Sequence, residues 1–393
     1  MVAPSYDPSR SEAVVLEAIR RTPGITRAEI ADRTNLTRGT VTNTVNELMR
    51  RNLVEESGKR ITDRGQPPIE LRIRPNTGYT IGVHHAYRLI NVAVTDIDGT
   101  ILWTDRATLE PGDPVPTIDR IAEVTLANIA RLEQRKQHLV GVGFATFGPI
   151  DLAAGTVSPP IYGEAWQHQP LRRMLADRIG QRVWMDNDAT CATIGEFWYG
   201  DASIYDDFLH VYFGYGLGGG MFLGGRVRRG ASFNAGEVGH VIVDSQGSPW
   251  FHGPAGSFES EASLLRLERD LGAPPPHDRD VFALERPEVN DWFDRAGVRL
   301  AQVAASSDHL LDLEAIVVGG LLHETSLQKL VHRANIELSR FGIGNRPQRA
   351  ELLTGTTGPY SAALGAAMLP VYDSFLPSRS AVMPNERAFS IPG

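Results

Sequence analysis

The chain has 393 residues, 42% of them apolar, and a formal net charge of −8 at pH 7. At roughly 150 residues per domain this length predicts two or three domains, and the apolar share is typical of a folded globular protein. No run of about 18 apolar residues predicts a membrane span, and the first ten residues lack an apolar stretch of signal-peptide length, so we expect a cytoplasmic protein without a membrane partner. The single cysteine, Cys191, excludes an intramolecular disulfide and a zinc site built on several thiolates.

The charge is unevenly distributed along the chain. Residues 1–75 contain 13 Lys and Arg against 10 Asp and Glu, whereas the remainder contains 26 against 37. A modestly basic head on an acidic body fits a head that meets a polyanion. We expect two units, a head over 1–75 and a body over 78–393.

Three helical patterns open the head. The stretch SEAVVLEAIRR carries an apolar stripe typical of a helix, and the following PGI breaks it. In TRAEIADRT, Thr26 and Glu29 have the spacing of a capping box, which predicts a second helix. The third pattern, TRGTVTNTVNELMRR, has its apolar residues on one helical face, namely Val41, Val45, Leu48 and Met49.

The second and third patterns together predict a helix-turn-helix, in which the later helix enters the major groove of DNA. Arg can read guanine and Asn can read adenine, while Thr hydroxyls can hold phosphates. After this helix, 52–73 reads as two short strands around a basic turn, a wing. The candidate contacts to double-stranded operator DNA are Thr37, Arg38, Thr40, Thr42 and Asn43 in the helix, and Arg60, Arg64 and Gln66 in the wing.

The alternative for the head is a small helical protein-interaction domain with a solvated polar face. Such a face would favour Glu and Lys over Thr, which is a poorer helix former. The polar run RGTVTNT therefore favours a DNA-reading helix.

Strands and helices alternate through the body. Apolar runs in 78–103 predict three antiparallel strands, and TIDRIAEVTLANIARLEQR predicts a long helix. A buried type of strand, LVGVGFAT, follows, then a helix that ends at Gly180, and then a strand that runs into a helix in RVWMDNDATCATIGEFWYG. This mixture predicts an α/β protein.

The stretch FGYGLGGG, from Phe213 to Gly220, has five glycines in eight residues. A lone glycine-rich match of this kind is a weak sign of a dinucleotide site. A Rossmann loop also needs a helix behind it, whereas MFLGGRVRRG reads as a strand and a turn. We therefore predict a β-hairpin loop.

The order of motifs in the body resembles a known family. GVGFATFGPID, WMDNDATCATIGE, GYGLGGG, GASFNAGEVGH, VVGGLL and SAALGAAML follow one another as in the ROK family of repressors, sugar kinases and uncharacterised reading frames. The resemblance implies a two-lobed actin-like (ribonuclease-H-like) ATPase fold over 78–393, with a C-terminal helix at about 361–376 that returns to the first lobe. The winged helix-turn-helix head matches the repressor branch of that family.

The family's kinases carry a first phosphate loop, Asp-x-Gly-Gly-Thr, whose Asp positions magnesium. The aligned stretch here runs from His84 to Arg88, so His84 replaces the Asp and Ala86-Tyr87 replaces the glycine pair. Asp188 stands where the family places the base for phosphoryl transfer. Without the first loop we expect neither a catalytic residue nor a nucleotide cofactor, and Asp188 becomes an acceptor for sugar hydroxyls.

The resemblance also implies a sugar site. Carboxylates and amides bind vicinal hydroxyls, usually beside an apolar wall. By match of motif, the candidate sugar-binding residues are Asn187, Asp188, Glu237, His240 and Glu259, each of which has a structural role as its alternative. Trp166 is either a wall of this cleft or a packing residue, and Asp186 is expected to be a turn or cap residue.

The family's zinc loop is altered in this chain. Its three cysteines are replaced by Trp250, His252 and Ser257. Two histidines, His240 and His252, make a poor structural zinc site, because such a site normally has four ligands. We expect no metal, with packing by Trp250, Phe251 and Phe258 in its place.

These patterns imply a sugar-responsive transcription regulator, most simply a repressor, that binds DNA as a homodimer or homotetramer and holds a sugar effector without phosphorylating it. The alternatives are a bifunctional ATP-dependent sugar kinase and a ligand-independent DNA-binding protein.

Overall fold

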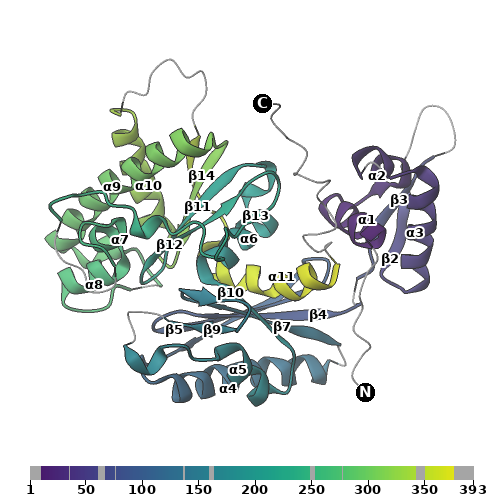
Figure 1. The fold of residues 1–393 in the computed structure, drawn as a ribbon, viewed down its shortest axis with the longest axis horizontal. Coiled ribbons are helices and arrows are strands. Elements are labelled where there is room, and N and C mark those ends of the chain that lie inside the picture. Colours follow the sequence, from purple (N-terminus) through teal and green to yellow (C-terminus); the bar gives the residue numbers. More distant parts are fainter. Residues whose placement is uncertain are drawn as a thin grey trace, which may run out of the picture.

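A computed structural model describes residues 10–375 without 35, 61–66, 76, 136–137, 159–162, 248–252, 277 and 342–349. These residues form a small N-terminal head and a larger body with two lobes, each lobe built on its own five-stranded sheet (Figure 1). Within these ranges no helix has the length and apolar character that crossing a membrane requires.

The head is a winged helix-turn-helix, as predicted. Its elements in chain order are α1 (Arg10–Arg21), β1 (Ile25–Thr26), α2 (Arg27–Thr34), α3 (Arg38–Arg50), β2 (Val54–Lys59) and β3 (Ile69–Ile73). The strands pair antiparallel in the order β1-β3-β2, so β2 and β3 are the two strands of the wing.

Local hydrogen bonds fix where the two helices of this motif begin. The Thr26 backbone N–H donates to Glu29 Oε2 at 2.8 Å, and the Glu29 N–H donates to Thr26 Oγ1 at 3.3 Å, which is the predicted capping box. Thr37 caps α3 by accepting from the Thr40 N–H at 3.1 Å. Val41 and Val45 are fully buried, so the opposite face of α3 is turned to solvent.

The first lobe contains the three antiparallel strands predicted from its sequence. Its elements are β4 (Tyr79–His85), β5 (Leu89–Asp96), β6 (Ile101–Thr108), α4 (Pro114–Gln134), β7 (Leu139–Thr146), β8 (Ile150–Asp151), β9 (Thr156–Val157), the 3-10 helix η2 (Glu164–Trp166), α5 (Leu171–Ile179) and β10 (Val183–Asn187). The sheet order is β10-β7-β4-β5-β6, with β7 and β10 parallel to β4. As predicted, α5 ends at Gly180, which has a left-handed φ of 64°.

The last helix, α11 (Ser361–Phe375), returns to this sheet as predicted, and it lies on the face opposite α4 and α5 (Figure 1). Gly82 in β4 and Gly143 in β7 make this contact possible. A Cβ atom at either position would collide with the backbone of α11, at Ala363 and Ala366 respectively. The helix therefore lies directly on the strand backbones.

The second lobe follows α6 (Asp188–Tyr199) and η3 (Asp201–Ile204). Its elements are β11 (Phe208–Phe213), β12 (Leu217–Phe222), β13 (Val227–Arg228), η4 (Val238–His240), α7 (Phe258–Ala262), α8 (Leu264–Leu271), η5 (Val281–Leu284), α9 (Pro287–Leu311), β14 (Ala315–Gly320), α10 (Glu324–Leu338), β15 (Glu351–Thr354) and η6 (Gly358–Tyr360). The sheet order is β13-β12-β11-β14-β15. Helices α6 and α11 lie between the two sheets (Figure 1), which gives the layered, two-lobed architecture that the motifs imply.

The glycine-rich stretch is the β11–β12 hairpin, as predicted. A Cβ at Gly218 would lie 2.9 Å from the Cβ of Ala189, and one at Gly220 would collide with Thr193. Both neighbours belong to α6. The glycines of this hairpin therefore let α6 pack closely against β12.

The head contacts the body through α1. Leu16 and Arg20 of α1 face Ile97 of the first lobe and Val371 of α11 around a small apolar depression. The Arg20 guanidinium also stacks over the ring of Trp198, near the end of α6. Arg20 is only 8% exposed, so this contact is an internal part of the interface between the head and the body.

Candidate functional site: the cleft between the lobes

A cleft of about 960 Å³, part of it open to solvent, lies between the two lobes. All five predicted sugar-binding residues line it: Asn187, Asp188, Glu237, His240 and Glu259. Residues from distant stretches of the sequence thus converge on one cavity.

The start of α6 positions two of these residues. Asn187 is the N-cap, and its Oδ1 accepts from the N–H groups of Ala189 at 2.9 Å and Thr190 at 3.2 Å. These two bonds use the amide oxygen of Asn187. The Nδ2 group lies beside Gly148, which also lines the cleft. Asn187 can therefore donate to a ligand hydroxyl while it holds the helix start in place.

Asp188 is an acid of the cleft whose pKa is strongly raised. Its side chain is 21% exposed, and Oδ2 lies 4.0 Å from Nε2 of His84. The pKa of Asp188 is raised to about 7, mainly by burial and in part by the nearby carboxylates of Glu237 and Glu259. The bond that its Oδ1 accepts from the Ala189 N–H acts in the opposite direction and lowers the pKa. A hydroxyl donated by a ligand would stabilise the ionised form of this carboxylate.

The second lobe contributes the opposite edge of the site. Glu237 precedes η4 and His240 is its last residue. His240 Nδ1 lies 3.2 Å from Glu237 Oε2, a hydrogen bond that raises the pKa of His240. Both side chains remain accessible, at 38% and 42% exposure. Glu259, near the start of α7, accepts from the Leu217 N–H at 2.9 Å and so ties α7 to the turn of the glycine-rich hairpin.

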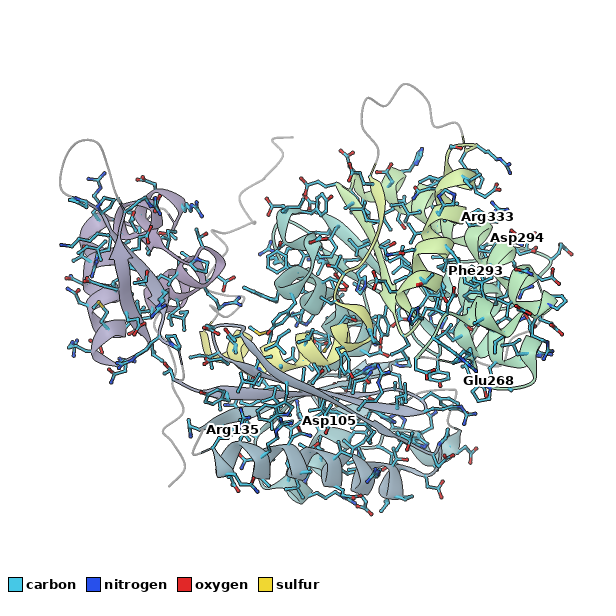
Figure 2. All side chains as sticks on the ribbon, turned by 180° about the vertical axis from the view of Figure 1, so that it is seen from behind. Asp105, Arg135, Glu268, Phe293, Asp294 and Arg333 are labelled. Atoms are coloured by element: carbon cyan, nitrogen blue, oxygen red, sulfur yellow. The ribbon has the colours of Figure 1, made fainter. Side chains whose placement is uncertain are left out.

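The altered first loop connects the lobes. His84 is fully buried, and burial lowers its pKa to about 3, so it is neutral at pH 7. Tyr87 packs against Tyr215 of the β11–β12 hairpin, with ring centroids 5.2 Å apart. Arg88 donates to Glu268 of α8 at 2.8 Å, and Figure 2 shows Glu268 on the side of the second lobe that faces the first. The loop that holds phosphates in the kinases thus bridges the lobes in this chain.

Some features of the cleft were not predicted. Its apolar wall includes Leu265 and Leu321, which come from separate stretches of the chain and have no shared sequence signal. Trp166 is 1% exposed and donates from Nε1 to the Gly112 carbonyl at 2.9 Å, so it is a packing residue. Asp186 is not a turn or cap residue, because it is 3% exposed and its Oδ2 accepts from Nε and Nη2 of Arg229 at 2.9 and 2.7 Å, which forms an ion pair.

The predicted DNA-reading residues gather on the exposed side of α3. Thr37, Arg38, Thr42 and Asn43 are exposed, and Thr40 is half-buried. Arg60 instead bonds within the head, to Glu29 at 2.7 Å, Glu70 at 3.0 Å and the Gly24 carbonyl at 2.9 Å. The structure therefore gives Arg60 a role in holding the wing to the start of α2, while Arg64 and Gln66 lie outside the described residues.

The altered zinc loop is described only in part. Trp250, Phe251 and His252 lie outside the described residues, whereas Ser257 and Phe258 are buried. Ser257 caps α7 by accepting from the Ser260 N–H at 3.2 Å. Among the residues that the structure describes, no group of three His, Cys, Asp or Glu side chains could hold a metal ion.

Replacing Asp188 by the isosteric Asn should stabilise the ligand-free protein in a pH-dependent way. The folded pKa of about 7 lies above the ordinary value of 3.8, so native stability falls as the pH rises between these values, because only the unfolded chain ionises there. Asp188→Asn removes this dependence. We expect the melting temperature of the variant to exceed that of the native protein increasingly from about pH 4 to about pH 7 and to level off above, measured by calorimetry in the absence of sugar. A constant difference across this range would contradict the buried carboxyl with its raised pKa.

The fold and this cleft define a two-lobed protein of the sugar-kinase type that carries a winged helix-turn-helix. The ROK family model matches residues 79–371, and a MarR family model matches residues 6–60. The chain belongs to the ROK family and has an N-terminal MarR-type helix-turn-helix.

The chain is similar both to repressors and to sugar kinases. The xylose repressor of Bacillus subtilis is 29% identical over 66% of this chain and 67% of its own, and the glucokinase of Thermotoga maritima is 31% identical over 62% and 77%. The chain spans about two thirds of the length of the repressors it matches. The crystal structure of a ROK family transcriptional regulator, a homologue of the E. coli MLC protein, superposes with a TM-score of 0.72 at 19% identity, covering 93% of this chain and 97% of that one.

A ROK family glucokinase from Streptomyces griseus, in complex with glucose and AMPPNP, gives a TM-score of 0.62 at 28% identity and covers 74% of this chain and 99% of that one. The kinase therefore leaves about a quarter of this chain uncovered. The regulator, in contrast, covers nearly the whole chain.

Proposed function

We propose that the chain is a sugar-responsive transcription regulator, a repressor that binds operator DNA through its head as a homodimer and holds a neutral sugar in the cleft without phosphorylating it. The observation that carries the proposal is the composition of the cleft. Five side chains suited to sugar hydroxyls surround one cavity, while the loop that would hold a phosphate is blocked and bridges the lobes. The xylose repressors among the relatives make xylose the first sugar to test.

Phosphorylation is disfavoured by the same residues. A kinase needs a carboxylate that positions magnesium and a backbone that approaches the phosphates closely. At these positions the chain has His84, which is buried and neutral, and Tyr87, whose ring packs on Tyr215. Asp188 keeps a suitable pKa for a base, but a base alone does not position a phosphoryl donor.

Helix α6 offers a route from the sugar to the head. Asn187 and Asp188 lie at its first turn in the cleft, and Trp198 lies in its last turn, beneath Arg20 of α1. At a rise of about 1.5 Å per residue, the helix separates these ends by about 17 Å. A sugar that closes the lobes by drawing Asp188 toward the second lobe would move the surface on which the head rests. Such coupling requires that the sugar bind one lobe arrangement more tightly than the other.

A thermal-shift screen of monosaccharides and disaccharides with the full chain tests the proposal. A true effector at about 100 times its Kd should stabilise the protein by about 2.7 kcal/mol, because it binds only the folded state. We expect at least one sugar, with xylose tested first, to raise the melting temperature. Glu237→Ala should remove the rise, since Glu237 faces the cleft and is 38% exposed.

The control for this screen is Glu123→Ala, which removes an exposed carboxylate of α4 that pairs at the surface with Arg120. It should leave the sugar response unchanged. If no sugar shifts the native protein, the chain is a ligand-independent DNA-binding protein. A shift that survives Glu237→Ala would place the sugar elsewhere.

A further inference from the structure

The cleft has two ends of different chemistry. One end carries the amide and the acids described above. The other end is walled by Ala86 and Tyr87 of the first lobe and by Tyr215, Leu265 and Leu321 of the second, all of which line the same cavity. Ala86, Tyr215 and Leu321 are buried, whereas Tyr87 and Leu265 are half-buried and keep side-chain surface at this end of the cleft.

The two ends adjoin one another through named contacts. Glu259 accepts from the N–H of Leu217, two residues after Tyr215 in the hairpin turn. On the other side, Asp188 lies 4.0 Å from His84, which precedes Ala86 and Tyr87 by two and three residues. A ligand whose hydroxyls reach Asp188 and Glu259 therefore has the two tyrosines as its next neighbours.

The charges at the apolar end are unsuited to a phosphate. His84 is neutral because burial lowers its pKa to about 3. Arg88 is directed to Glu268 at 2.8 Å, and Asp188, Glu237 and Glu259 line the same cavity with acidic groups. An uncharged ring suits this environment, because the flat apolar face of a second sugar or of an aromatic group packs well on tyrosine.

We propose that the effector carries two rings, a hydroxyl-rich sugar at Asp188 and a second, uncharged ring packed against Tyr87 and Tyr215. The inference rests on the proposed function and specifies its ligand as a disaccharide or an aryl glycoside. The Arg88–Glu268 ion pair fixes the loop that carries Tyr87, and with it the wall of the subsite.

Calorimetric titration of the full chain tests the inference. The ligands are the free sugar, the methyl glycoside, the phenyl glycoside and the β-1,4-linked disaccharide, each for xylose and for glucose. The phenyl glycoside or the disaccharide should bind about tenfold more tightly than the methyl glycoside of the same sugar, because its second ring buries apolar area and packs on tyrosine. Tighter binding of only one of the two identifies the second ring as an arene or a sugar.

Variants of Tyr87 locate the second ring. Tyr87→Ala should remove the tenfold preference, because it weakens the two-ring ligands about tenfold more than the methyl glycoside, whereas Tyr87→Phe should retain the preference. The matched control is Tyr205→Ala, which truncates a tyrosine paired with Glu351 away from the cleft and should change neither affinity.

Two results would overturn the inference while leaving the sugar site intact. One is equal affinity for methyl glycoside and two-ring ligands, and the other is an equal loss for both in Tyr87→Ala. Binding of none of these ligands would instead overturn the sugar site together with its extension. Melting temperatures of the Tyr87 variants close to the native value show that each has folded.

Discussion

Removal of the Arg38 guanidinium, in Arg38→Ala, is expected to weaken operator binding by about 1–3 kcal/mol, the range for a bidentate contact to guanine. Arg38 is the first residue of α3, it is exposed, and Thr37 fixes the backbone beside it as the N-cap. No ion pair is seen between Arg38 and the described residues. Its side chain is therefore available to a base edge at the start of the reading helix.

The measurement is binding of the full chain to a duplex that it selects from a random pool, at several salt concentrations. If Arg38 reads a base, the variant should lose discrimination at one position of the site, whereas a phosphate contact would reduce the salt slope by about one unit. Arg173→Ala is the matched control, because Arg173 is 83% exposed on α5 in the body. Equal losses in the two variants would show a general charge effect and not reading by α3.

The fold was largely predictable because its local signals agree with one another. Each of these signals depends on a few neighbouring residues. Examples are the capping box of Thr26 and Glu29, the left-handed Gly180 and the buried face of α3. The hairpin of the glycine-rich stretch was predictable for the same reason. A strand and a turn, and not a helix, follow it in the sequence.

The cleft was only partly predictable. Motif matches located its five polar residues, because these lie in short, recognisable stretches. The apolar end was missed, since Leu265 and Leu321 come together with Tyr87 only when β14, α8 and the β4–β5 turn meet. The partner of Asp186 was missed for the same reason, because Arg229 is 43 residues away in the chain. Arg60 of the wing is of a residue type that often contacts DNA. The sequence did not show that its side chain bonds to carboxylates of its own domain.

Trp198→Ala is expected to separate sugar binding from DNA binding. The ring of Trp198 supports Arg20 at the interface between the head and α6, at the opposite end of that helix from the cleft. Affinity for sugar alone and for operator alone should remain near the native values. The factor by which sugar changes operator affinity, typically about 5- to 150-fold in coupled systems, should fall toward unity.

Because linkage is reciprocal, operator DNA should also cease to change the affinity for sugar in this variant. Arg20→Gln should have the same effect from the other side of the contact, and the double variant should add little to either single one. The matched control is Arg182→Gln, which removes the guanidinium 4.2 Å from the ring centroid of Trp184 in the first lobe. Coupling that persists in both Trp198→Ala and Arg20→Gln would show that the signal reaches the head along α11, whose Val371 borders the same apolar depression as Leu16 of α1.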